Sequence, residues 1–211
     1  MRFANREEAG RRLADMLLHY ERNPDTVVLA LPRGGVPIGY ELSRRLGLPL
    51  DIFFVKKIPS PYNEEAGIGA VSENGYIQLN EDAVRALRVG EEYIRRRVSE
   101  KLEAMKSKRA LYARPLPDFE GKTVILCDDG IATGSSMLLA VDAAAKAGAK
   151  KVVVAVPVAP LALLDILEEV ADEVYVLEPV EELVAVGYYY SDFHQLDDEE
   201  VMDYLDRSMA L

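Results

Sequence analysis

The sequence has no tryptophan, a single cysteine and no long hydrophobic run. Cys127 cannot form a disulfide within the chain, which fits a reducing compartment and predicts a cytoplasmic protein with a buried structural thiol. A transmembrane helix needs about 18 or more consecutive apolar residues, and none is found, so no membrane span is expected. Residues 1–17 are charged throughout and lack the apolar core of a signal peptide.

Positive charge is also scarce. The chain carries 25 Lys and Arg against 36 Asp and Glu, a formal net charge of −11. This balance argues against nucleic acid or an acidic membrane surface as a general partner. No Gly-Lys-[Ser/Thr] sequence occurs, which excludes a Walker P-loop. An anionic ligand would therefore need local cations, helix N-termini or a metal ion at its site.

Short apolar runs, typical of buried strands, alternate along the chain with segments that have the periodicity of amphipathic helices. This alternation predicts one α/β domain over residues 1–211. Buried strands are predicted at 26–31, 50–56, 122–128, 151–157 and 172–179. Helices are predicted at 5–20, 37–46, 135–147 and 160–170, with two more between 80 and 112 that break near Gly90. An Asn-Gly turn indicates a hairpin of residues 67–72 and 76–79. Continuous apolar strands between helices predict a doubly wound, mostly parallel sheet with helices on both faces, and ligands bind beyond the carboxyl ends of such strands.

The most informative segment is VILCDDGIATGSS, residues 124–136. An apolar strand ends in Asp128 and Asp129 and then turns into a helix. Carboxylates can accept hydrogen bonds from sugar hydroxyls or hold Mg²⁺, and the start of a helix suits a phosphate. The turn is built from Ala132, Thr133, Gly134, Ser135 and Ser136. The segment predicts a sugar-phosphate site with a metal nearby, and the alternative is an ordinary turn in which Asp residues cap the helix.

Two basic motifs follow the first and second predicted strands. Arg33 supplies a forked cation for a diphosphate, and Gly34 with Gly35 lets backbone N–H groups approach an anion closely. A plain β-turn explains the same residues. Lys56 and Lys57 end the second strand, where they could hold an anion or simply mark a strand that runs into solvent.

Aromatic residues gather near the C-terminus, in LVAVGYYYSDFHQ at 183–195. Tyr188, Tyr189, Tyr190 and Phe193 could contact a ligand or pack this segment against the body of the protein. His194 is interpreted as a surface or packing residue, and no residue stands out as a general base.

Residues 124–136 resemble the phosphoribosyl-pyrophosphate (PRPP) signature of type I phosphoribosyltransferases. The Arg33–Gly35 turn is similar to the pyrophosphate loop of that family, and the Lys56–Lys57 pair to its basic residues before a flexible flap, here 58–67. The resemblance identifies residues 180–211 as the region of a small C-terminal hood that stacks on the acceptor base. The segment VKKIPSPYNEEAGIGAV resembles an uncharacterised subgroup whose motifs do not name the acceptor. The loop of that subgroup is Pro-Asn-Pro-Glu-like, and here it reads Tyr62-Asn63-Glu64-Glu65, so a proline is replaced.

The resemblance implies a pentosyltransferase that moves 5-phosphoribosyl from PRPP to a nitrogen acceptor, such as a nucleobase, and releases pyrophosphate with Mg²⁺ as cofactor. It assigns catalytic roles to Asp128, Asp129, Lys57 and Arg33, with both aspartates as metal ligands. Substrate-binding roles fall on Gly34, Gly35, Lys56, Ala132, Thr133, Gly134, Ser135, Ser136, Tyr189 and Phe193. Two alternatives stay open: a non-catalytic PRPP- or nucleotide-binding regulator of the same fold, and a hydrolytic activity on a sugar phosphate. A homodimer is also left open.

Overall fold

The computed structural model describes residues 2–64 and 66–210, and its main sheet is parallel. The strand order is β2-β1-β6-β7-β8. Its strands are β1 (Thr26–Ala30), β2 (Leu50–Ile52), β6 (Thr123–Cys127), β7 (Lys151–Pro160) and β8 (Glu173–Val180). The chain proceeds outward in one direction from β1 to β2 and in the other from β6 to β8. The switch point therefore lies between β1 and β6, where an open parallel sheet binds its ligand.

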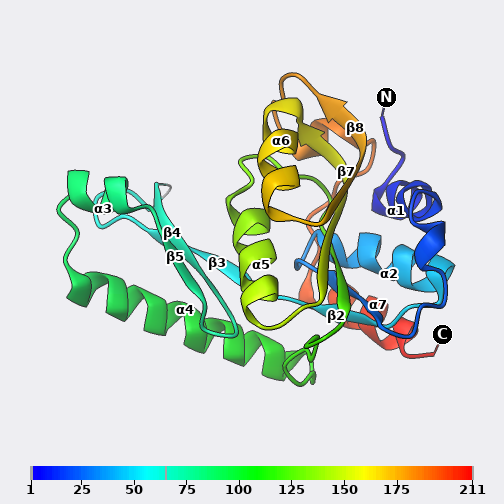
Figure 1. Ribbon diagram of the computed structural model, residues 1–211, viewed down its shortest axis with the longest axis horizontal. Coiled ribbons are helices and arrows are strands. Elements are labelled where there is room, and N and C mark those ends of the chain that lie inside the picture. The colour runs from blue at the N-terminus through cyan, green and yellow to red at the C-terminus, as the bar shows by residue number, and fades with distance from the viewer. Residues whose placement is uncertain (1, 65, 211) are drawn as a thin grey trace.

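Helices cover both faces of this sheet (Figure 1). One face carries α1 (Arg6–Asp15), α2 (Gly35–Leu46) and α7 (Asp198–Ser208), and the other carries α5 (Ser135–Lys146) and α6 (Leu161–Val170). Side chains of a strand alternate between the two cores: Val28 and Ala30 belong to the first, Val27 and Leu29 to the second. The predicted doubly wound α/β fold is confirmed.

A second, antiparallel sheet extends away from the main one (Figure 1). It consists of β3 (Val55–Pro59), β4 (Gly67–Ser72) and β5 (Ile77–Leu79), followed by α3 (Glu81–Ala86) and α4 (Glu91–Leu111). The predicted hairpin and the helix break at Gly90 are confirmed. The expected flap at 58–67 begins inside β3 and ends at the first residue of β4, and its residue 65 lies outside the described residues.

The single strand predicted at 50–56 is wrong, because the chain changes sheets at Phe53 and Phe54. The Phe53 N–H still donates to Ala30 O (2.9 Å), whereas the Phe54 N–H donates to the Glu73 carboxylate (2.9 Å). The two rings also enter opposite cores. Residues 50–52 thus complete the parallel sheet, and residues 55–59 start the antiparallel one.

Arg109 anchors α4 to the segment where the chain changes from one sheet to the other. Its buried guanidinium donates to the Glu73 carboxylate and to Asp51, and to the backbone oxygens of Ile52 and Pro115. The antiparallel sheet and its long helix are thereby joined to the end of β2.

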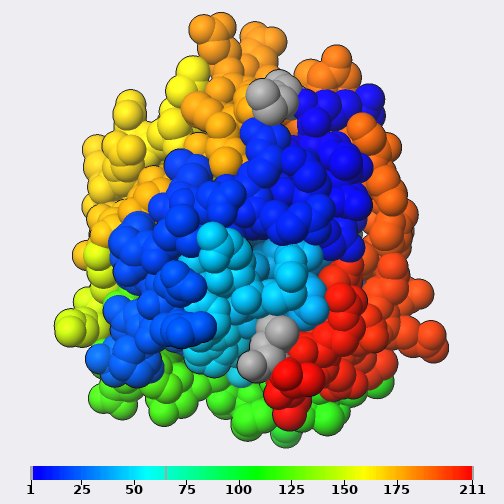
Figure 2. All heavy atoms as spheres, turned by 90° about the vertical axis from the view of Figure 1, so that its right-hand side faces the viewer, coloured from blue at the N-terminus to red at the C-terminus, as the bar shows by residue number. Residues whose placement is uncertain are grey.

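The two ends of the chain meet on the α1 and α2 side. The predicted helix at 5–20 is α1 followed by a 3₁₀ turn, η1 (Leu18–Tyr20), and a second 3₁₀ turn, η2 (Val186–Tyr189), lies near the C-terminus. Phe3 and Tyr190 form an isolated β-bridge, and Tyr204 on α7 donates a hydrogen bond to Glu7. Figure 2 looks onto this side, where N-terminal residues in blue lie beside C-terminal residues in red. None of the helices within the described ranges is long and apolar enough to cross a membrane.

Candidate functional site

The two predicted ligand loops meet at the switch point. Ala30 pairs with Cys127 across β1 and β6. The Arg33–Gly35 turn and the acidic pair, Asp128 and Asp129, therefore follow the ends of two neighbouring strands. A Cβ on Gly34 would lie 2.1 Å from Asp129 Oδ2, and one on Gly35 would lie 2.7 Å from Cys127 O. Both glycines are therefore required for the contact between the two loops. Cys127 is buried, as expected, and burial raises the pKa of its thiol.

The acidic pair is largely buried, and Arg6 is the cation that pairs with its negative charge. Asp129 Oδ2 accepts a hydrogen bond from Arg6 Nε (2.9 Å), and Asp128 Oδ1 accepts one from the Asp129 N–H (2.8 Å). Burial and the neighbouring carboxylate raise the pKa of Asp128 well above its usual range, and burial also raises that of Asp129. Cations or hydroxyl donors from a ligand would relieve this repulsion.

The pair also fits Mg²⁺. No third carboxylate, histidine or thiol completes a metal cluster with these aspartates within residues 2–64 and 66–210. Mg²⁺ is commonly bound through one or two carboxylates, with phosphate oxygens and water as the other ligands. The donor set is therefore one that a bound diphosphate would complete.

Arg6 is a site residue that the sequence did not reveal. Besides its ion pair with Asp129, its Nη1 donates to His194 O (2.9 Å), and its guanidinium carbon lies 3.9 Å from the centre of the Phe193 ring. A charged residue in the first turn of an N-terminal helix carries no local signal of this role. Arg6 holds the acidic pair, the C-terminal segment and α1 together.

A cavity of about 310 Å³ opens beside the acidic pair. It is lined by Arg6, Arg33, Gly34, Asp128, Asp129, Phe193, His194, Gln195 and Leu196. The His194 ring is exposed, and hydrogen bonds to Glu200 and Asp192 raise its pKa. It is thus a surface residue at the cavity mouth, in agreement with the interpretation from the sequence.

The turn after the acidic pair presents an open helix start. Gly134 is the N-cap of α5 and has a positive φ of 85°, and no side chain caps this helix. Ala132, Thr133, Ser135 and Ser136 are exposed around it. The first N–H groups of a helix and its dipole attract an anion. The alternative interpretation, in which an aspartate caps the helix, does not fit this geometry.

The two adjacent lysines do not share a cavity. Successive side chains of a strand point to opposite faces. Lys57 lines a cavity of about 450 Å³ together with Thr133 and Ser135 of the α5 turn, and Lys56 does not line it. Burial and the charges of Lys101, Arg33 and Lys108 lower the pKa of Lys56. Lys56 therefore lies on the side of β3 that faces Arg33 and α4.

The aromatic residues divide between packing and the cavity. Tyr190 is buried, its hydroxyl donates to Asp129 O (2.6 Å), and burial raises its pKa. Phe193 lines the cavity and stacks on Tyr190, with ring centres 5.0 Å apart. Tyr189 is half-buried and does not line the cavity, and Tyr188 is 70% exposed. Tyr190 therefore holds the backbone of the acidic pair through its hydroxyl, and Phe193 forms one wall of the cavity.

Known proteins share this architecture. The family described as "Phosphoribosyl transferase domain" matches residues 3–190. The "Putative phosphoribosyl transferase Rv0571c" of Mycobacterium tuberculosis is 36% identical over 209 residues, which are 98% of this chain and 47% of the mycobacterial protein. The chain thus spans about half the length of the curated relatives it matches.

Two solved structures extend the similarity. TT1426 from Thermus thermophilus superposes with a TM-score of 0.82 at 39% identity, covering 97% of this chain and 98% of that one. AQ2163 from Aquifex aeolicus has a TM-score of 0.51 at 15% identity, over 85% and 76% of the two chains, and supports the fold alone. The parallel sheet, the loops at its switch point and the match over most of the chain agree: this protein belongs to the phosphoribosyl transferase domain family.

Proposed function

We propose that this protein transfers the 5-phosphoribosyl group of PRPP to a nitrogen atom of a small acceptor and releases pyrophosphate, with Mg²⁺ bound. The observation that carries the proposal is the meeting of an acidic pair, an uncapped helix start and an Arg-Gly-Gly turn at the switch point. These are the three groups that a phosphorylated sugar with a diphosphate substituent would engage.

The sugar phosphate would lie between the acidic pair and α5. N–H groups at the start of α5 and the hydroxyls of Thr133, Ser135 and Ser136 would bind the 5-phosphate. Asp128 and Asp129 would accept hydrogen bonds from the ribose 2- and 3-hydroxyls. Arg6 Nε holds Asp129 Oδ2 (2.9 Å), which orients one of the two carboxylates.

The reaction would proceed by loss of pyrophosphate from C1 and attack of the acceptor nitrogen on the opposite face. Positive charge develops on the ribose and negative charge on the leaving group, so binding and electrostatics would supply most of the rate enhancement. Arg33 and the backbone of Gly34 and Gly35 would hold the pyrophosphate, with Lys56 approaching from β3. Lys57, on the other face of β3, would approach the 5-phosphate instead. Mg²⁺ held by Asp128 and Asp129 would supply further positive charge to the diphosphate oxygens.

The acceptor would enter the cavity that Phe193 and Arg33 line. Its volume of about 310 Å³ supports a small acceptor such as a nucleobase or a related heterocycle. Phe193 contributes an apolar wall, while its ring already stacks on Tyr190 and lies under the Arg6 guanidinium.

The proposal is tested by measuring pyrophosphate release from PRPP in the presence of individual nucleobases and small amines, with Asp128→Asn as the inactive control. Release that depends on one acceptor and is lost in the variant supports the transferase. If the protein binds PRPP and no acceptor triggers the release of pyrophosphate, it acts as a PRPP-sensing regulator. Release that needs no acceptor indicates hydrolysis.

A further inference from the structure

Helix α4 runs alongside the side of β3 that carries Lys56. Tyr93 Oη donates to Pro59 O (3.0 Å) near one end, and Arg109 Nη2 donates to Ile52 O (2.6 Å) near the other. The helix between these contacts is about 24 Å long at about 1.5 Å per residue. Residues 52–59, which run from the end of β2 through the change of sheet into β3, span at most about 23 Å at about 3.3 Å per residue. The two elements therefore run side by side in opposite directions.

This arrangement places Lys101 level with Lys56. Lys101 lies halfway along the helix between Tyr93 and Arg109, and the matching midpoint of residues 52–59 falls at residues 55–56. Lys101 also follows Tyr93 by eight residues and precedes Lys108 by seven, so all three lie on one side of α4. Lys101 is the first of the charged groups that lower the pKa of Lys56.

Only part of the positive charge near Lys56 is neutralised by ion pairs. Lys108 pairs with Asp198 (2.6 Å), and Tyr112 Oη donates to the other oxygen of that carboxylate (2.7 Å). By contrast, the side chains of Arg33, Lys56 and Lys101 make no hydrogen bond or ion pair with any other residue that the structure describes. Lys101 is half-buried. Three clustered positive charges without partners are unfavourable by themselves, and they indicate an anionic ligand.

We infer that Lys101 of α4 is an additional binding residue for the departing pyrophosphate, together with Arg33 and Lys56. The inference rests on the proposed function and adds a residue to its diphosphate site. Pyrophosphate is the ligand of choice because Arg33 comes from the loop beside the acidic pair. The 5-phosphate would bind at α5, on the other face of β3, where Lys57 lines the cavity with Thr133 and Ser135. Lys101 therefore contacts the diphosphate and not the sugar phosphate.

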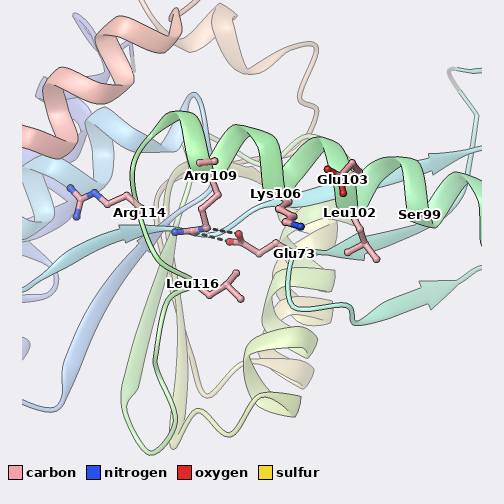
Figure 3. A pocket seen from close by; sticks show the side chains of 9 residues that line it. Glu73, Ser99, Leu102, Glu103, Lys106, Arg109, Arg114 and Leu116 are labelled. Atoms are coloured by element: carbon pink, nitrogen blue, oxygen red, sulfur yellow. Dashed lines mark hydrogen bonds and ion pairs between the residues drawn. The ribbon is translucent and has the colours of Figure 1, made fainter.

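The test compares Lys101→Met with Lys106→Met. Lys106 is exposed on the same helix and lines a different cavity of about 540 Å³ beside Glu73 and Arg109, as Figure 3 shows. Both changes remove one charge and keep an unbranched side chain, so the net charge of the two variants is equal. Pyrophosphate and ribose 5-phosphate are titrated separately into each variant by calorimetry with Mg²⁺ present.

Lys101→Met is expected to raise the Kd for pyrophosphate about tenfold and to leave the Kd for ribose 5-phosphate unchanged, because a charge-assisted hydrogen bond is lost at one subsite only. Lys101→Arg should restore most of the affinity, and Lys106→Met should bind both ligands like the wild type. Equal pyrophosphate affinity in Lys101→Met and wild type overturns the inference, as does equal loss of both ligands. Wild-type protein that binds neither PRPP nor pyrophosphate overturns the proposed function itself.

Discussion

Gly34→Ala is expected to separate the two loops of the site. The new Cβ would lie 2.1 Å from Asp129 Oδ2 and 2.6 Å from its Cγ, whereas real contacts of a Cβ essentially never fall below 3.0 Å. Either Asp129 or the Arg33–Gly35 turn must therefore move by about 1 Å in a close-packed region. Such overpacking costs about 1–3 kcal/mol of stability. It also strains the ion pair between Asp129 and Arg6.

The effect on binding should exceed the effect on stability. A misplacement of about 1 Å in a positioning group can cost about 100-fold in activity, and we expect PRPP affinity to fall by at least about tenfold. Calorimetry with PRPP and Mg²⁺ measures the affinity, and urea unfolding measures the stability. Gly90→Ala is the matched control, because its Cβ would meet no atom within 4 Å and its φ of −76° suits alanine. Gly90 caps α4, so this control should lose less than about 1 kcal/mol of stability and no affinity. If Gly34→Ala binds PRPP like wild type, the contact between the loops does not organise the site.

Four further predictions concern the same site. Asp128→Asn should raise stability at pH 7: the raised pKa of Asp128 means that its carboxylate destabilises the fold increasingly as pH rises from the unfolded value of 3.8, and urea unfolding between pH 4 and 8 should show a flatter profile. Burial raises the pKa of Asp129 as well, but its ion pair with Arg6 opposes that rise, so Asp129→Asn should gain less stability than Asp128→Asn, and an equal gain in the two variants would contradict this assignment. PRPP should bind much more weakly when EDTA removes Mg²⁺, and unchanged affinity in calorimetry would count against metal binding at the acidic pair. Gly134→Val should abolish ribose 5-phosphate binding while pyrophosphate still binds, because a β-branched residue cannot adopt a φ of 85° without strain; loss of both ligands would refute separate subsites.

The main sheet was predictable because β1, β6 and β7 are almost continuous apolar runs and β8 has an apolar centre, Val174–Leu177. The change of sheet at Phe53 and Phe54 was not, since two consecutive apolar residues continue the pattern of a buried strand. The parallel strand ends where the Phe54 N–H donates to the Glu73 carboxylate, which lies 19 residues further along the chain, instead of to β1. Helix α7 was also missed, although Asp197 and Glu200 form a capping box that a closer inspection of the sequence could have found.

The candidate site was predictable where it is local in sequence. Asp128, Asp129 and the turn after them are contiguous, so their residue types and order could be interpreted together. Arg6 lies 123 residues from its partner Asp129, and only the fold brings them into contact. Lys101 likewise lies near Lys56 only because α4 packs along β3, and neither segment by itself indicates that the two charges are close.

The anchoring of α4 by Arg109 constrains how the site could close. Its five hydrogen bonds join α4, the turn after β4, the end of β2 and the segment that leaves α4. A swing of the whole antiparallel sheet would break this buried junction and leave a guanidinium without partners, which is costly. We therefore expect the base of the sheet, with Lys56 and Lys101, to act as a fixed wall. Any closure over a substrate would then fall to the segment after β3, residues 60–64, which lies beyond the reach of that junction.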